Sequence, residues 1–270
     1  KRAWFVADPY RRLAELRLTI KEAPEGKDMS DVEEDILNLE RRIARIEAES
    51  LLAQGNPEEA MQRLQPALRA PTSELYVVRG RVHKALAAKA TGEEKRALLV
   101  KAAQDLVRGV EPKAVLEGGE LYWQDEALAL EPDRVQRARI AFMQAADVVE
   151  TALPGIAADS PQRKEYTDLH ARVLQRLKEM DRLGAGYLAA AKAQQREGKL
   201  LDALESARTA TVLLGDYPEA YRVQGILHRD LSRQSSGAAR KAYAEDAAVS
   251  FSAALALNNL LTSQRVELCL

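Results

Sequence analysis

Apolar residues recur along most of the chain at spacings of three and four positions, which is the spacing of one face of an α-helix. One clear stripe within residues 31–54 consists of Val32, Ile36, Leu39, Ile43, Ile46 and Leu51. No segment alternates apolar and polar residues over the length of a strand, so we expect no β-sheet. The pattern therefore predicts an all-α protein.

Residues that favour helix starts stand between these apolar stripes. Ser30 and Glu33 have the spacing of a capping box, in which two side chains bind free backbone N–H groups. At three further predicted helix starts, a proline directly follows the expected N-cap residue. Proline is common at this first helical position. These starts are Asn56-Pro57, Glu131-Pro132 and Ser160-Pro161.

The chain contains an internal repeat, which is the signature of stacked helical units. Residues 74–112 match residues 219–257 when the sequence is shifted by 145 positions. Both segments carry the pattern Glu-x-Tyr-x-Val-x-Gly, followed by His83 in the first copy and His228 in the second. The preceding segments align at a shift of 143 positions. We therefore expect two copies of a two-hairpin unit.

Each expected hairpin has small residues where two helices would approach closely. The first helices carry Ala48, Gly80, Ala191 and Gly225, and the second helices carry Ala60, Ala67, Ala102, Gly109, Ala203, Ala210, Ala247 and Ala254. Over residues 41–112 and 184–259 this arrangement resembles the tetratricopeptide repeat (TPR) family in divergent form. The resemblance implies an α-solenoid of helical hairpins wound into a right-handed superhelix.

Four regions are predicted along one continuous solenoid. They are an N-terminal helical arm (residues 1–29, with a helix over 9–20), a first hairpin pair (30–112), a helical spacer (113–164), and a second hairpin pair with a C-terminal cap (165–270). Within the spacer, Gly118-Gly119 is expected to break the chain before a helix over residues 132–153. Residues 266–270 would cover the last hairpin, because solenoid ends need a cap.

Composition excludes several classes of function. A net charge of −1 provides no field for nucleic acid, so we expect no nucleic-acid partner. No run approaches the roughly 20 apolar residues of a membrane helix, so no direct membrane insertion is expected in this segment. The chain begins at Lys1 rather than methionine, so we expect that an upstream segment was removed by processing or left out of this sequence, and that segment could be a signal or an anchor. Localisation therefore stays open between the cytoplasm and the periplasm, with or without a membrane anchor.

Candidate catalytic chemistry is sparse. The three histidines, His83, His170 and His228, have no cysteine near them in sequence, and Cys269 is the single thiol. A zinc site needs three or four clustered ligands. Gly184-Ala185-Gly186 is too short for a dinucleotide-binding loop. We therefore predict no metal, no cofactor, no catalytic residue and no enzymatic activity.

The TPR resemblance does imply a binding surface, because ligands of that family lie along the concave face made by the first helices. The corresponding positions here are Arg42, Arg45, Arg81, Lys84, Lys192, Arg222 and Arg229. Guanidinium groups pair with carboxylates through two hydrogen bonds, so this set predicts an acidic peptide as the ligand. The alternative is that nearby acids such as Glu49, Glu74 and Glu219 neutralise these side chains.

Tyr122 and Trp123 form a candidate aromatic anchor for a partner, with burial in the core of the spacer as the alternative. The function expected from these features is that of a protein–protein interaction scaffold or adaptor. One alternative is a subunit of a cell-envelope or secretion assembly, anchored through a missing N-terminal segment. Another is a small-molecule sensor or enzyme with a pocket between repeats. Homo-oligomers formed by stacking of end hairpins are compatible with all three.

Overall fold

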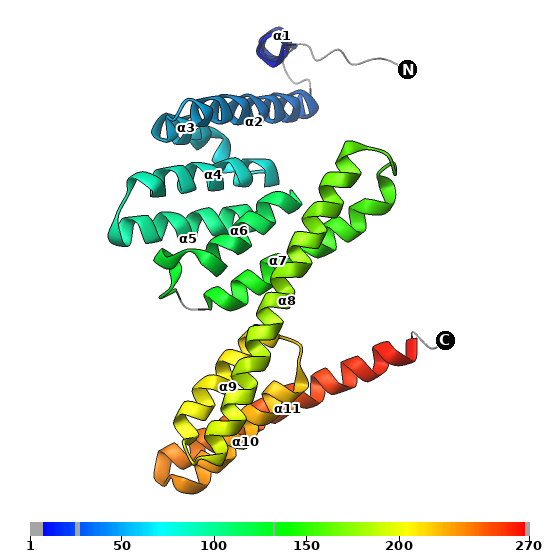
Figure 1. Ribbon diagram of the computed structural model, residues 1–270. Coiled ribbons are helices and arrows are strands. Elements are labelled where there is room, and N and C mark those ends of the chain that lie inside the picture. The colour runs from blue at the N-terminus through cyan, green and yellow to red at the C-terminus, as the bar shows by residue number, and fades with distance from the viewer. Residues whose placement is uncertain (1–7, 25–27, 132, 268–270) are drawn as a thin grey trace. The chain divides into compact units, whose positions relative to one another are not determined.

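The computed structural model of the protein describes residues 8–24, 28–131 and 133–267, with side chains described as far as residue 259. Within these ranges the chain forms eleven α-helices, three short 3-10 turns and no β-strand (Figure 1). The prediction of an all-α protein is therefore confirmed. The chain divides into two compact units, Lys1–Pro132 and Asp133–Leu270, which are described separately.

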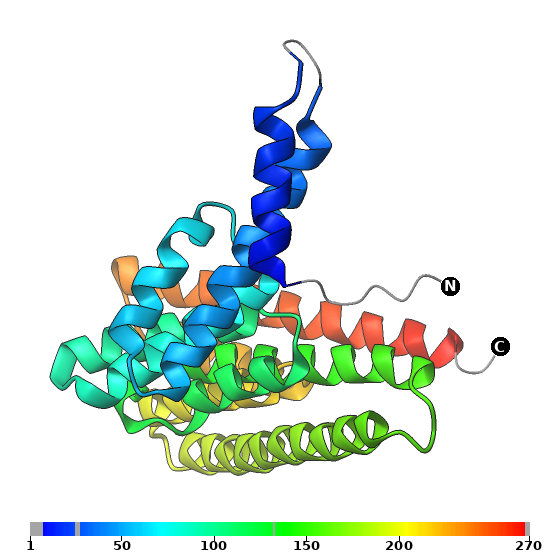
Figure 2. The ribbon, with the colours of Figure 1, turned by 90° about the horizontal axis from the view of Figure 1, so that it is seen from above.

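The first unit consists of an N-terminal helix and a series of packed hairpins. Its helices are α1 (Pro9–Lys21), α2 (Ser30–Ala53), α3 (Pro57–Leu64), α4 (Ser73–Lys89), α5 (Gly92–Arg108) and α6 (Pro112–Gln124), with 3-10 turns at Gln65–Arg69 and Glu126–Leu128. Each helix packs against the next, and α2 also contacts α4 directly. In Figure 2, α1 lies beside the N-terminal part of α2.

The second unit is organised around one long helix. Its helices are α7 (Arg134–Ala152), α8 (Pro161–Arg196), α9 (Leu200–Leu214), α10 (Pro218–Gln234) and α11 (Gly237–Glu267), with a 3-10 turn at Leu153–Gly155. Helix α8 packs against α7 and also against α9, and α10 packs against α11 (Figure 1). Helices α8 and α10 are in direct contact, as α2 and α4 are in the first unit.

The small residues of the repeat lie inside the hairpins, as the sequence predicts. All twelve are buried. A Cβ atom added to Gly80 would lie 2.9 Å from Cγ of Leu106, and one added to Gly225 would lie 2.8 Å from the ring of Phe251. Leu106 and Phe251 are equivalent positions at the 145-residue shift. In both copies, a large residue of the second helix therefore covers a glycine of the first.

Gly118 and Gly119 do not break the chain, and that prediction is wrong. Both are buried within α6. A Cβ atom on Gly118 would lie 2.9 Å from the backbone oxygen of Ala103 and 2.8 Å from Cγ2 of Val107, both on α5. Glycine thus allows α6 to approach α5 closely. Helix α6 belongs to the first unit and α7 to the second, so the predicted spacer is divided between them.

The helix starts agree only in part with the sequence prediction. Asn56 and Ser160 are N-cap residues, and Oγ of Ser160 accepts a hydrogen bond from the backbone N–H of Arg163 at 3.1 Å. The predicted Ser30 capping box is absent, because Met29 occupies the N-cap position of α2. The backbone N–H of Ser30 donates instead to Oδ1 of Asp28 at 3.0 Å.

The bounds of helices α1 and α7 differ by one or two residues from the predicted bounds. Helix α1 ends one residue later than predicted, at Lys21. Helix α7 begins at Arg134, two residues later than predicted, after Asp133 adopts a left-handed conformation with φ of 57°. Residues 266 and 267 continue α11 and 268–270 lie outside the described residues, so the C-terminal cap stays a prediction. No helix among the described residues is long and apolar enough to cross a membrane.

Candidate functional site

The seven basic residues predicted from the TPR resemblance lie on the first helices of four hairpins. Arg42 and Arg45 are on α2, Arg81 and Lys84 on α4, Lys192 on α8, and Arg222 and Arg229 on α10. Four therefore belong to the first unit and three to the second. Within each unit, several of them pair with carboxylates of neighbouring helices.

An ion pair joins the first two hairpins of the first unit. Arg45 on α2 donates to the carboxylate of Glu74 at the start of α4. The Arg45 side chain is about one third exposed, and Glu74 is more exposed than that. Arg42 is exposed on the same helix, and no ion pair of this residue is found in the described part of the chain. The pair therefore spans two neighbouring first helices at the surface.

Two further ion pairs connect α4 to α6 and its N-cap residue. The Nη2 atom of Arg81 lies 3.4 Å from both carboxylate oxygens of Glu111, which precedes α6. Nζ of Lys84 donates to Oε1 of Glu117, on α6, at 2.5 Å. Together with the bridge from α2 to α4, these pairs form a row of charges across three helices. We call this row the first-helix surface of the first unit.

The second unit repeats the same kind of bridge. Nζ of Lys192 on α8 lies 2.9 Å from Oε1 of Glu219 on α10. Glu219 also accepts two hydrogen bonds from Arg222, at 2.6 and 2.7 Å. These interactions lower the pKa of Glu219 to about 2, and the hydrogen bonds from Arg222 have the largest effect. Burial acts in the opposite direction and raises the pKa. Glu219 and Glu74 are equivalent repeat positions, so both copies use this glutamate to bind a basic residue of the preceding hairpin.

Six of the seven basic residues thus have a carboxylate partner inside their own unit, since Arg229 also pairs with Asp230 at 3.2 Å. Glu74 and Glu219, two of the acids named in the alternative interpretation, are among these partners. An acidic ligand would have to exchange with these carboxylates. Because surface ion pairs contribute only about 0–1 kcal/mol each, such exchange has a small free-energy cost.

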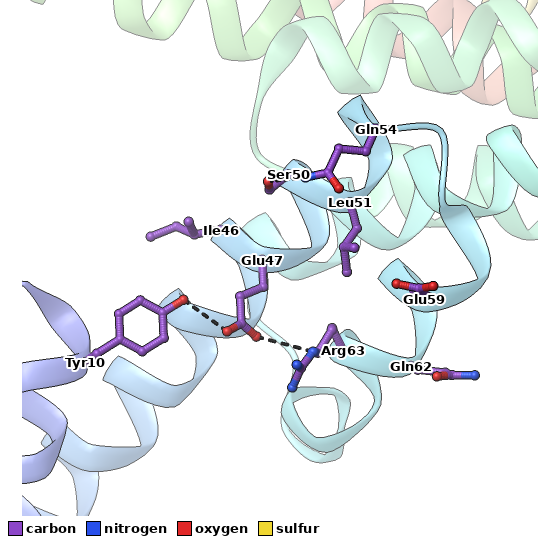
Figure 3. A pocket seen from close by; sticks show the side chains of 9 residues that line it. All are labelled: Tyr10, Ile46, Glu47, Ser50, Leu51, Gln54, Glu59, Gln62 and Arg63. Atoms are coloured by element: carbon purple, nitrogen blue, oxygen red, sulfur yellow. Dashed lines mark hydrogen bonds and ion pairs between the residues drawn. The ribbon is translucent and has the colours of Figure 1, made fainter.

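The first unit also has a groove of about 710 Å³ between α1, α2 and α3, which is lined by none of the residues of this row (Figure 3). Glu47 on α2 lies at its centre. The hydroxyl of Tyr10 donates to Oε1 of Glu47 at 3.0 Å, and Nε of Arg63 lies 3.7 Å from Oε2. The hydrogen bond to Glu47 raises the pKa of Tyr10. The groove combines these charges with the apolar side chains of Ile46 and Leu51, which suits a peptide better than a small apolar molecule.

The aromatic pair Tyr122-Trp123 ends α6. The Tyr122 side chain is 3% exposed, and Trp123 is half-buried. Tyr122 is therefore a core residue of the first unit and does not present its ring to solvent. For Tyr122, the structure therefore agrees with the alternative interpretation, in which the residue is buried in the core.

Each histidine lies next to a single carboxylate. Nδ1 of His83 is 3.2 Å from Asp105, and Nε2 of His170 is 2.9 Å from Glu150. His228 is 2% exposed, and its Nδ1 lies 3.8 Å from Asp246. Within the described ranges, no group of three or more histidine, cysteine, aspartate or glutamate residues is placed to hold a metal ion.

The first unit also contains a buried charge cluster that was not predicted from the sequence. Nε and Nη2 of Arg79 on α4 donate to Asp105 on α5 at 2.7 and 2.6 Å. Burial raises the pKa of Asp105, but the hydrogen bonds from Arg79 and His83 outweigh burial and hold the pKa below its usual value. A difference between the two repeat copies could have indicated this cluster in the sequence. The residues equivalent to Arg79 and Asp105 in the second copy are Gln224 and Ser250.

Comparison with known proteins adds no assignment. No protein-family model matches the chain, and no curated protein sequence matches it.

Proposed function

We propose that the protein is a divergent TPR-like scaffold or adaptor that binds a segment of a partner protein on the first-helix surface of its first unit. The observation that carries this proposal is the exposed row of exchangeable ion pairs across α2, α4 and α6. The row lies on rigid, packed helices. A partner can therefore bind there without a large cost for ordering the protein.

The direct contact of first helices in both units supports the repeat part of the proposal. Helices α2 and α4 touch, as do α8 and α10, and each contact carries a basic residue paired with an equivalent glutamate. Buried small residues inside every hairpin permit this stacking. Helices stacked in this way present an extended surface, which is the property that repeat proteins use for binding.

The charge of the partner follows from the geometry of the row. Arg45, Arg81 and Lys84 come from helix interiors, where their positions are set by packing. Glu111 lies at the N-cap position of α6, and Glu74 at the start of α4. Arginine binds carboxylates through a planar fork, so replacement of the intramolecular acids by those of an acidic segment preserves the hydrogen bonds.

Two charge-reversed variants test this proposal. The first changes Arg45, Arg81 and Lys84 to glutamate. The second changes their partners, with the substitutions Glu74→Arg, Glu111→Lys and Glu117→Lys. Both break the same three ion pairs and cost the fold about the same, but they give the surface opposite charge. Each is immobilised after circular dichroism shows native helix content, and is compared with wild type for capture from an extract of the source cell.

A partner that wild type and the acid-reversed variant retain, and that the base-reversed variant loses, would support an acidic ligand on this surface. Chemical cross-links from that partner to α2, α4 or α6 are expected in the same sample. Equal capture by both variants would show that the surface is not used. Loss from the acid-reversed variant alone would mean that the partner is basic, contrary to the proposal.

A further inference from the structure

A second groove in the first unit has a chemistry that the first-helix surface does not share. It has a volume of about 330 Å³ and lies between α3 with its following 3-10 turn, α4 and α5. Its polar lining includes Arg79, Lys101 and Arg108, together with His83 and the amide of Gln104. We call it the cationic groove.

Positive charge in the cationic groove exceeds negative charge. Three cations line it, and Asp105 is its one lining carboxylate. That carboxylate is already bound by two hydrogen bonds from Arg79 and one contact with His83. Lys101 and Arg108 are exposed, and neither forms an ion pair with any residue in the described ranges. Two positive charges therefore face the groove without an internal counter-charge.

The two arginines of the groove are held in place by one aromatic ring. The guanidinium carbon of Arg79 lies 5.1 Å from the centroid of Tyr76, and that of Arg108 lies 5.6 Å from it. Cation–π contacts at these distances are attractive and restrict the side chains. Asp105 further fixes Arg79 through Nε and Nη2, which leaves Nη1 to donate elsewhere. The two arginines are thus positioned before any ligand binds.

The second copy of the repeat shows that the hairpin fold does not require this charge. Tyr221 stands at the position equivalent to Tyr76, so the ring is kept. The positions of the three cations instead hold Gln224, Asp246 and Ala253. The second hairpin of each pair folds with either set of residues. The cations therefore call for an explanation beyond packing.

We propose that the cationic groove binds a phosphate group, with Lys101 and Arg108 as its charge partners and Nη1 of Arg79 as a further donor. The two unpaired cations match the charge of a phosphate monoester, which is close to −2 at neutral pH. Guanidinium and ammonium groups are favoured partners of phosphate in proteins, because they combine positive charge with several hydrogen-bond donors. The group can come from free phosphate or from a phosphorylated side chain of another protein. The proposal does not depend on the first-helix surface.

Nuclear magnetic resonance of the full chain with labelled arginine side chains tests the site. Inorganic phosphate is added at constant ionic strength, with chloride as the balancing ion. Saturable shifts of the Arg79 and Arg108 Nε–H signals are expected. The double variant Lys101→Ala, Arg108→Ala should weaken phosphate binding by about tenfold for each cation removed. Both residues are exposed and neither forms an ion pair within the described ranges, so the variant should keep its fold, which circular dichroism checks.

A matched control removes the same charge elsewhere in the first unit. Arg42→Ala with Lys95→Ala lowers the net charge equally but lies outside the groove. This control should bind phosphate as wild type does. Equal weakening in the control, or shifts that do not saturate, would show only general attraction to a positive surface and would overturn the proposal. Acetate with an affinity equal to that of phosphate would also overturn it.

A short peptide containing one phosphoserine distinguishes the two sources of the group. Binding at least about tenfold tighter than inorganic phosphate, with no binding of the unphosphorylated peptide, would identify a phosphorylated protein segment as the ligand. Equal affinities would identify the free ion. Either result supports the site, provided that it is lost in the Lys101→Ala, Arg108→Ala variant.

Discussion

Gly184 and Gly186 provide a direct test of helix packing in the second unit. Both lie in α8, two residues apart. A Cβ atom added to Gly184 would lie 2.6 Å from Cγ of Leu214 and 3.0 Å from Cβ of Leu213, both on α9. A Cβ atom added to Gly186 would meet nothing within 4 Å. The same substitution therefore fills a tight contact at one position and open solvent at the other.

The expected magnitudes follow from two effects. Alanine is about 1 kcal/mol more favourable than glycine in a helix interior, and both variants gain this. Overpacking in a close contact costs about 1–3 kcal/mol, and only Gly184→Ala suffers it, because Cβ of Leu213 cannot move without its backbone. We expect Gly186→Ala to stabilise the unit by about 1 kcal/mol and Gly184→Ala to destabilise it by about 1 kcal/mol.

Urea unfolding followed by circular dichroism measures both variants against wild type. The unfolding transition whose midpoint these variants shift is assigned to the second unit. The midpoint urea concentrations are then compared with one common m-value, the slope of the free energy of unfolding against urea concentration. A difference of about 2 kcal/mol between the two variants is expected. If Gly184→Ala stabilises the unit as much as Gly186→Ala does, the close approach of α8 and α9 at this glycine is wrong.

Three further predictions concern titratable groups. Asp105→Ala should destabilise the first unit by about 3 kcal/mol in urea unfolding, because it leaves Arg79 partly buried without its counter-charge. Glu219 should titrate near pH 2 by carbon NMR, and Arg222→Ala should raise this value toward 4.5. The pKa of Glu219 is lower in the folded than in the unfolded chain, so the stability that Glu219 contributes is present above about pH 4.5 and lost as pH falls toward 2. Equal loss of stability in acid for wild type and Arg222→Ala would contradict this. Burial lowers the pKa of His228, so the unfolded chain binds its proton more readily and stability should fall as pH drops below about 6.5; His228→Leu should remove that dependence, as pH-dependent unfolding can check.

The all-helical repeat could be read from the sequence because its signals are local. Apolar spacing of three and four residues marks one face of a helix wherever it occurs. Small residues at equivalent positions, such as Gly80 and Gly225, mark helix contacts in both copies. Prolines after Asn56 and Ser160 mark helix starts for the same reason, since a first-turn proline acts within its own helix. These features need no knowledge of what lies across the contact.

Tertiary structure decided the features that depend on a partner distant in sequence. Gly118-Gly119 is compatible with a chain break or with a close helix contact, and only the position of Ala103 on α5 selects the contact. Arg81 and Lys84 were identified as surface cations, but their pairing with acids about 30 residues away was not. Net charge and composition are sums over the chain. The charge that a ligand meets depends on which side chains the packed helices bring within a few ångströms of one another.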